Sequence, residues 1–375
     1  MRWHSEQRSV INKKGKIHLS LITDALYLSM KNLNFIFLIS FFLWLKESNA
    51  QVNNEIPAIH IAPAPLFRDP ITDGAADPVM VWNREEKKWW MLYSQRRANV
   101  EAPDVAFCYG TDIGIATGEN NGHDWVYRGI LNLEFEKGKN TFWAPDIVYH
   151  NGEYHMFVVY IQGVRMHWGG KARMAHYVSK NLWDWKFIGF LKLSSENVID
   201  ASLMQMPDKI WRMWYKDDAH NAAIMMAESK DLYKWTNNEN PVLNQTQQEG
   251  PINFKFGDYY WMITDEWHGM RVYRSKDANT WEKQGLILDS ASSRNEDRPS
   301  GAHGDVVVLS DKAYIFYFTH PGRKTHGDAT LRADGIYPFD ERRSSIQVAP
   351  LEIKDGTLVS DRSKPFDFWL TSPSP

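Results

Sequence analysis

One pattern recurs five times between residues 77 and 318, and it constrains the fold more than any other feature of the chain. In each copy an acidic residue opens a short apolar strand, a turn follows, and a strand rich in aromatic residues comes next. The first copy joins Asp77-Pro-Val-Met-Val-Trp82 to Trp89-Trp-Met-Leu-Tyr93. The five opening residues are Asp77, Asp146, Asp200, Glu249 and Asp305.

The spacing of these openings predicts an all-β fold, a five-bladed β-propeller. They lie roughly 50 to 70 residues apart, and each interval holds about four strand signals bounded by Gly, Asn or Asp turns. Four copies end in a polar turn and a tryptophan, namely Trp125, Trp185, Trp235 and Trp281. The first strand of each blade lines the central channel. We therefore expect five acidic side chains at one mouth of that channel, with strands 58–61 and 345–348 closing the ring.

The amino-terminal residues 1–50 have the pattern of a leader and signal peptide. An apolar run, Asn34-Phe-Ile-Phe-Leu-Ile-Ser-Phe-Phe-Leu-Trp-Leu45, follows Lys31 and precedes small residues that end at Ala50. The run is roughly a dozen residues long, short of the ~20 that a membrane-spanning helix needs. We expect translation from Met30, cleavage before Gln51 and an exported, periplasmic or secreted protein of bacterial type. Residues 51–375 are predicted to form a single catalytic propeller, with no membrane contact after cleavage.

Composition narrows the class of ligand. The chain has 43 Lys and Arg against 46 Asp and Glu, so no large basic field is available to bind nucleic acid. Its single cysteine, Cys108, excludes an intrachain disulfide and a cysteine-rich zinc site. Aromatic residues make up 14% of the chain, and their flat faces suit sugar rings. A carbohydrate is the expected partner, and the sequence does not indicate an oligomeric state.

Carboxylates at the mouth of an aromatic cleft indicate glycoside hydrolysis, which needs one carboxylic acid and one carboxylate. Five motifs occur in register along the chain: Ala76-Asp77-Pro78, Trp143-Ala144-Pro145-Asp146-Ile147, Ile199-Asp200-Ala201-Ser202-Leu203, Glu249-Gly250-Pro251 and Gly301-Ala302-His303-Gly304. They resemble the successive blade motifs of glycoside hydrolase family 43, whose members are α-L-arabinofuranosidases, β-xylosidases, arabinanases and galactosidases. The resemblance spans residues 60 to 350, and families 32, 62, 117 and 130 are relatives in fold.

This resemblance implies three catalytic residues: Asp77 as general base, Glu249 as general acid and Asp200 as the modulator that orients substrate. We expect like-charge repulsion from Asp200 to raise the pKa of Glu249. Asp69 competes for the role of base but is not followed by a strand. Asp77 and Glu249 open non-adjacent inner strands, which predicts carboxyls ~6.5 to 9.5 Å apart and an inverting mechanism.

The resemblance also implies residues that support the site. Asp146 and His303 match positions that support the site or an axial cation, so His303 is a candidate ligand, through water, of a structural Ca²⁺. A histidine held only by hydrogen bonds is the alternative, and no cofactor is required for catalysis. The full set of candidate substrate-binding residues is Asp146, Trp143, Trp214, Trp267, His268 and His303. Departures from the family pattern at Ala201 and Asp305 leave the substrate class open.

Three alternatives stay open at this level. One is an exo-hydrolase of algal oligosaccharides, as in family 117. Another is a phosphorylase, as in family 130, which would need a basic phosphate pocket such as Arg323-Lys324 with His320 and His326. The third is a non-catalytic sugar-binding propeller, which would have no need of three catalytic carboxylates together.

Overall fold

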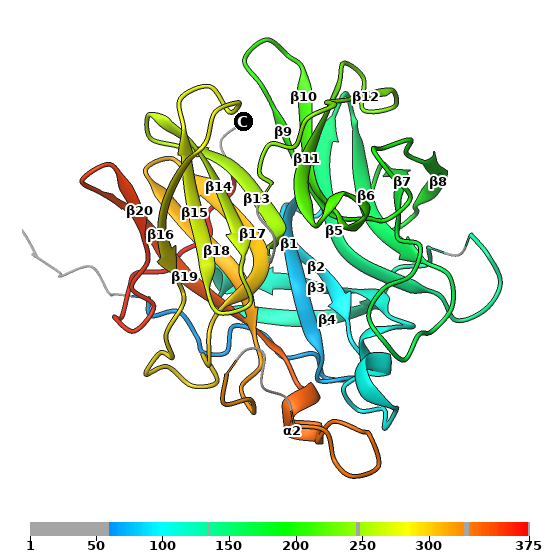
Figure 1. Cartoon of the computed structure of the whole chain (residues 1–375). Helices are drawn as coiled ribbons and strands as arrows, with labels where there is room; N and C mark the ends of the chain where they lie inside the picture. Colours follow the sequence, from blue (N-terminus) through cyan, green and yellow to red (C-terminus); the bar gives the residue numbers. More distant parts are fainter. Residues whose placement is uncertain (1–59, 134, 245–247, 326–329, 374–375) are drawn as a thin grey trace, which may run out of the picture. The chain divides into compact units, whose positions relative to one another are not determined.

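The computed structural model describes residues 60–373 except 134, 245–247 and 326–329, and these form five four-stranded antiparallel sheets (Figure 1). The predicted all-β, five-bladed propeller is therefore confirmed. Helical structure in these residues is limited to α2 (Phe339–Arg342) and the short 3₁₀ turns η1 (Asp104–Cys108), η2 (Asn120–Gly122) and η3 (Asp218–His220). None of the described helices is long and apolar enough to cross a membrane. The predicted leader, its start at Met30 and its cleavage site before Gln51 lie outside the described residues.

Each blade is a run of four consecutive strands. Blade 1 consists of β1 (Ala75–Asn83), β2 (Lys88–Gln95), β3 (Asp112–Glu119) and β4 (Asp124–Ile130). Blade 2 consists of β5 (Thr141–His150), β6 (Glu153–Ile161), β7 (Arg173–Ser179) and β8 (Lys186–Phe190). Blade 3 consists of β9 (Val198–Gln205), β10 (Trp211–Asp217), β11 (Ala223–Ser229) and β12 (Trp235–Asn237). Blade 4 consists of β13 (Glu249–Phe256), β14 (Tyr259–Asp265), β15 (Met270–Ser275) and β16 (Glu282–Ile287). Blade 5 consists of β17 (Ala302–Leu309), β18 (Lys312–Thr319), β19 (Ser345–Lys354) and β20 (Thr357–Val359).

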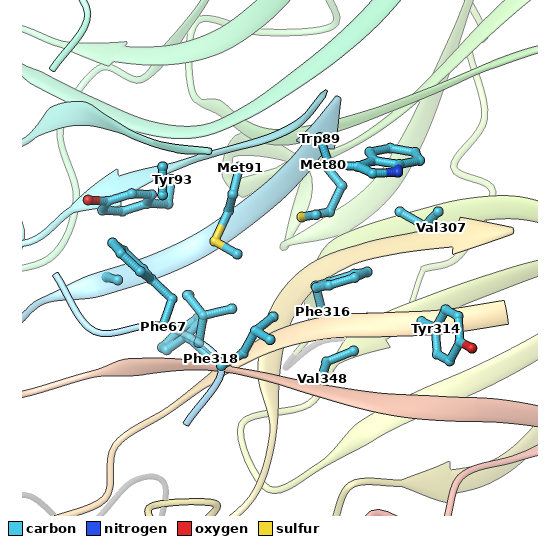
Figure 2. Packing of buried hydrophobic residues seen from close by; sticks show 14 of the residues in the cluster. Phe67, Met80, Trp89, Met91, Tyr93, Val307, Tyr314, Phe316, Phe318 and Val348 are labelled. Carbon is cyan, nitrogen blue, oxygen red and sulfur yellow. The ribbon is translucent and has the colours of Figure 1, made fainter. Parts of the chain in front are cut away.

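The apolar core lies between neighbouring blades, because alternate residues of each strand face opposite sides of its sheet. Figure 2 shows the junction of blades 1 and 5, where Met80 and Met91 face Phe316 and neighbouring side chains. Residues 345–348, expected to pair the chain ends, form the start of β19 in blade 5. The expected partner of residues 345–348 is wrong, because Ile346 bridges Phe67 and Ile61 bridges Asp367, whereas residues 58 and 59 lie outside the described part. This junction closes the ring.

The repeated tryptophan after each polar turn is an architectural feature. In blade 3 the hydroxyl of Ser229 accepts a hydrogen bond from the Leu232 N–H at 2.9 Å and so holds the turn. The indole of Trp235 then donates to the Leu232 carbonyl at 3.1 Å. Trp185 donates in the same way to the Leu182 carbonyl at 2.8 Å. These tryptophans are therefore part of the blades and not walls of a binding site.

Every inner strand has a register irregularity, a β-bulge, near its beginning. In four blades a residue there has a positive φ, which we call the bulge residue: Asp77 (49°), Ala144 (42°), Asp200 (57°) and Gly250 (56°). Such backbone is sparsely populated for residues other than glycine and is concentrated at functional sites. The bulges re-aim the side chains around them at one end of the propeller.

Side chains two residues beyond the bulge fasten three inner strands to the next one. Each accepts a hydrogen bond from a backbone N–H on the neighbouring inner strand. The pairs are Asp146 with Leu203 (2.6 Å), Ser202 with Asn253 (2.9 Å) and Asp305 with Met80 (2.8 Å). The last of these joins blade 5 to blade 1.

The other two blade junctions use a residue of the second strand. The Ser94 hydroxyl of β2 accepts from the Ala144 N–H at 2.8 Å, and the Asp265 carboxylate of β14 accepts from the His303 N–H at 3.0 Å. All five junctions thus have at least one side-chain acceptor that binds the next inner strand, which satisfies backbone groups near the bulges.

Candidate active site

A cleft of about 550 Å³ lies at the end of the propeller where the inner strands have their bulges. The carboxylates of Asp77, Asp200 and Glu249 all line it, so the structure brings together the three residues expected to be catalytic. They come from blades 1, 3 and 4. Asp77 and Asp200 are bulge residues, and Glu249 immediately precedes the bulge residue Gly250.

Asp77 is almost fully buried, and positive groups flank both of its carboxylate oxygens. Nη2 of Arg96 lies 3.3 Å from Oδ2, and Nδ1 of His303 lies 3.5 Å from Oδ1. Burial on its own would raise the pKa of Asp77, but the charge of Arg96 and the contact with His303 outweigh it and lower the pKa below its ordinary value. Asp77 is therefore an ionised carboxylate, the state that a proton acceptor requires.

Glu249 differs from the expectation in its protonation. Nζ of Lys216 lies 3.2 Å from Oε2, and the Trp267 side chain also hydrogen-bonds to the carboxylate. Burial would raise the pKa of Glu249, but the charge of Lys216 and these hydrogen bonds lower it. The expected rise in the pKa of Glu249 through repulsion from Asp200 is therefore not found. The sequence did not show that Lys216 lies beside this carboxylate.

Asp200 is the carboxyl that has the raised pKa. It is buried, and its Oδ2 accepts a hydrogen bond from the Gly250 N–H at 3.1 Å. Burial, followed by repulsion from Glu249 and Asp77 and opposed by the charge of His303, raises its pKa to about 7. When one carboxyl of an interacting pair is ionised, the other retains its proton more strongly. In this structure Asp200 is that partner.

His303 is a buried cation beside the expected base. Burial would lower the pKa of His303, but the contact with the Asp77 carboxylate and the charge of Asp200 raise it to about 9. The ring also explains Gly250, since a Cβ there would lie 2.3 Å from Cδ2 of His303. No group of three or more His, Cys, Asp or Glu among the described residues is arranged to hold a metal ion. The water-mediated Ca²⁺ site at His303 stays a prediction.

Of the expected aromatic walls, two line the cleft and one does not. Trp143 and Trp267 line it, and the Trp143 indole donates to the Cys108 carbonyl at 2.7 Å. Trp214 is fully buried on β10, packed against Trp281 with ring centroids 6.2 Å apart, so it belongs to the core. The expectation that Trp214 is a wall for the sugar is wrong.

His268 and Asp69 also lie outside this cleft. The His268 side chain is 69% exposed, 3.9 Å from Glu266, and is not among the cleft-lining residues. Asp69 is buried elsewhere and accepts hydrogen bonds from the Thr72 N–H at 2.6 Å and from Gln95 at 2.7 Å. Its position away from the cleft agrees with the prediction that Asp69 is not the base.

Asp146 and Asp305 do not reach the cleft mouth with the other three acids. They lie two residues beyond the bulges and line a separate cavity of about 20 Å³ between the inner strands. Burial and repulsion from Asp305 raise the pKa of Asp146 to about 7, and burial raises that of Asp305 to about 6. The expected ring of five acids at one mouth is thus wrong for these two, whose carboxylates bind backbone N–H groups at blade junctions.

Several cleft residues escaped the sequence reasoning. Arg96 follows β2, Lys216 lies near the end of the mostly buried β10, and Trp168 belongs to the loop between β6 and β7. A charged residue inside a strand that reads as core was the available signal for Lys216. Arg323 and His320, weighed earlier as a phosphate pocket, do line the cleft. Lys324 does not, and His326 lies outside the described residues.

Comparison with known proteins gives a consistent result. The model of glycosyl hydrolases family 43 matches residues 130–342, more than half of the chain. A thermostable family-43 glycoside hydrolase shares 18% identity and a TM-score of 0.57, over 82% of this chain and 99% of that chain. The GH43_1 enzyme from Xanthomonas citri, complexed with xylotriose, shares 13% identity and a TM-score of 0.56, over 84% and 97%.

An exo-1,5-alpha-L-arabinanase from a bovine ruminal metagenomic library shares 17% identity and a TM-score of 0.51, over 79% of this chain and 100% of that chain. No curated protein is significantly similar in sequence to this chain. These solved structures share its fold. Together with the family match and the carboxylate cleft, they lead to one conclusion: the chain belongs to glycoside hydrolase family 43 and is a glycosidase that hydrolyses O-glycosyl compounds.

Proposed function

We propose that this glycosidase inverts the anomeric configuration as it cleaves a plant or algal oligo- or polysaccharide, in the manner of an arabinofuranosidase or xylosidase. The observation that carries the proposal is the meeting of Asp77, Asp200 and Glu249 in one cleft, from three different blades. A binding module has no need of three acids side by side in one cleft, two of them buried, because like charges repel.

The roles of the three acids follow from their surroundings. Asp77, kept ionised by Arg96, accepts a proton from the attacking water. Glu249 donates a proton to the departing glycosidic oxygen, which lies on the opposite side of the anomeric carbon. Asp200 orients the substrate. Because its carboxyl and that of Glu249 repel each other when both are ionised, the pair tends to hold one proton. Trp143 and Trp267 supply aromatic surface for the sugar ring.

The proposed substrate class rests on similar proteins. Structural neighbours include an enzyme complexed with xylotriose, an exo-1,5-alpha-L-arabinanase and a xylan beta-1,4-xylosidase from Bacillus halodurans. All three names refer to pentose polymers or their fragments. We therefore place aryl xylosides and arabinofuranosides first among substrates to be tested.

Phosphorolysis is the second candidate, favoured by Arg323 and His320 in the cleft. Both side chains are already engaged with the protein, however. Nε of Arg323 donates to the Glu341 carbonyl at 2.8 Å, and Nδ1 of His320 lies 2.8 Å from the Arg343 carbonyl. Hydrolysis is the better supported reaction, and a rate that does not depend on inorganic phosphate is expected.

Stereochemistry is the direct test of the proposed mechanism. If Asp77 activates water and Glu249 protonates the leaving group, the first-formed sugar has the anomeric configuration opposite to that of the substrate. Proton NMR during hydrolysis in phosphate-free buffer, before mutarotation, gives the answer. Retained configuration, or a glycosyl adduct trapped on Asp77, would overturn the assignment of the base.

Export is part of the same proposal. The apolar run that ends at Leu45 and the small residues through Ala50 support cleavage before Gln51. Mass spectrometry of the protein from the periplasm or medium is expected to show an amino terminus near Gln51. An intact chain starting at Met1, active in the cytoplasm, would contradict export.

A further inference from the structure

One position of the blade repeat differs in blade 3. This position lies on the second strand of each blade. Its residue pairs with the inner-strand residue that comes just before the bulge. From blade 1 to blade 5 its occupants are Ser94, Val159, Lys216, Asp265 and Phe318. Ser94 and Asp265 use this position to accept a backbone hydrogen bond from the next blade. Lys216, at the same position, reaches a side chain of the next blade instead.

Lys216 is buried between two carboxylates. Its side chain is 8% exposed, and Nζ lies 3.2 Å from Oε2 of Glu249 and 3.0 Å from Oδ1 of Asp218. Nζ also lies 5.8 Å from the centre of the Trp267 ring. Taking an ammonium group out of water is costly unless it is paired, so these contacts hold Lys216 in place. Its main partner across the blade junction is the residue to which the proposed function assigns proton donation.

This arrangement creates a conflict that the reaction must resolve. A proton donor has to be protonated before the glycosidic bond breaks, but an ammonium group 3.2 Å away favours the carboxylate. Lys216 has three N–H donors, and Asp218 engages the ammonium group independently of Glu249. The ammonium group can therefore exchange Glu249 for a substrate hydroxyl without leaving its buried position.

We propose that Lys216 is a positioning residue that holds Glu249 as a carboxylate until a substrate hydroxyl takes its place beside the ammonium group, so that Glu249 is protonated only in the substrate complex. The inference rests on the proposed function of Glu249. The proton that Asp200 carries can pass to Glu249 at that point, and the total charge of the two carboxyls does not change. Proton donation is thus coupled to substrate binding.

Other charged groups around Glu249 do not provide this coupling. Those that face it from the packed elements are Asp200 and Asp218 of blade 3, Asp77 and Arg96 of blade 1, Asp265 of blade 4 and His303 of blade 5. Arg96 is paired with Asp77, and His303 lies against the same carboxylate. Lys216 is the cation in direct contact with Glu249 among the described residues.

The test compares two pH profiles of the wild-type enzyme. The fall of kcat/KM at high pH, its basic limb, gives the pKa of the acid in the free enzyme. The fall of kcat at high pH gives the pKa of the acid in the substrate complex. We expect the kcat limb to lie at higher pH by about one unit or more, because one nearby opposite charge shifts the pKa of a carboxyl by about one to three units. Coincident limbs in the wild type would overturn the proposal.

Three variants sharpen the test. Lys216→Met removes the charge and is expected to raise the kcat/KM limb towards the kcat limb. Lys216→Arg keeps the charge and is expected to preserve the pH difference between the kcat limb and the kcat/KM limb. Asp218→Asn removes the competing carboxylate, so Lys216 binds Glu249 more strongly and the kcat/KM limb moves to lower pH. A Lys216→Met enzyme that is slower but keeps both limbs in place would show that Lys216 has only a structural role.

The design separates this inference from the proposed function. If Glu249→Gln removes the basic limb but Lys216→Met does not move it, only the role of Lys216 is wrong. If Glu249→Gln leaves the basic limb intact, the assignment of Glu249 as the acid fails first. Thermal melts check that each variant is folded. Should Lys216→Met not fold, the opposite outcomes expected for Lys216→Arg and Asp218→Asn still decide the question.

Discussion

Glu249→Gln is expected to slow the cleavage of substrates with poor leaving groups by about 10²- to 10⁴-fold, the usual contribution of a general acid. The loss should be much smaller for aryl glycosides such as nitrophenyl sugars, whose leaving groups depart with little protonation. The measurement is kcat/KM for a disaccharide and an activated aryl glycoside of the same sugar. Because glutamine retains the shape of glutamate, the contrast between substrates reflects the missing proton.

Glu239→Gln is a suitable control, because Glu239 is exposed and lies outside the cleft. It should leave both rates unchanged. Equal losses on the two substrates in Glu249→Gln would point instead to a role in binding or in holding Lys216 and Trp267.

Asp77→Asn should slow both classes of substrate, by about 10²- to 10⁴-fold or more, because the same activated water displaces a good and a poor leaving group alike. The amide cannot accept the proton, and it also removes the negative charge that faces Arg96 and His303. The pKa of His303, raised to about 9 partly by Asp77, is expected to fall. The same pair of substrates, with NMR titration of His303, measures both effects.

Asp69→Asn separates catalysis from folding in this test. Asp69 is buried and hydrogen-bonded but does not line the cleft. Its replacement should lower the melting temperature and leave the rate of the folded enzyme intact. Full activity in Asp77→Asn, or a loss confined to poor leaving groups, would rule out Asp77 as the base.

The sequence carried the fold because its signals were local and repeated. Apolar alternation, Gly and Asn turns and the tryptophan after each turn all specify one blade, and five copies specify a ring. All five acids open inner strands, and the resemblance to family 43 marked Asp77, Asp200 and Glu249 as the catalytic set. Asp146 and Asp305 were expected to reach the same mouth of the channel. The bulges made the difference, because an inserted residue changes which side chain faces the cleft and leaves no clear trace in the pattern.

Contacts between side chains of different blades could not be predicted from the sequence. Lys216 meets Glu249 across a blade junction, so no local motif joins them, and the protonation of the proposed acid could not be foreseen. The tryptophans show the same limit. Trp143 lines the cleft and Trp214 lies in the core, although both stand in aromatic-rich strands, because burial depends on which blade packs beside each one.

The hydrogen bond from the Met80 N–H to Asp305 joins the last blade to the first, three residues beyond Asp77. The contact that closes the ring therefore also helps to hold the proposed water-activating carboxylate in place. Any fraying that separates blade 5 from blade 1 displaces Asp77 from His303, which belongs to blade 5. We therefore expect heat inactivation to begin with the separation of blade 5 from blade 1, before the middle blades lose their strands.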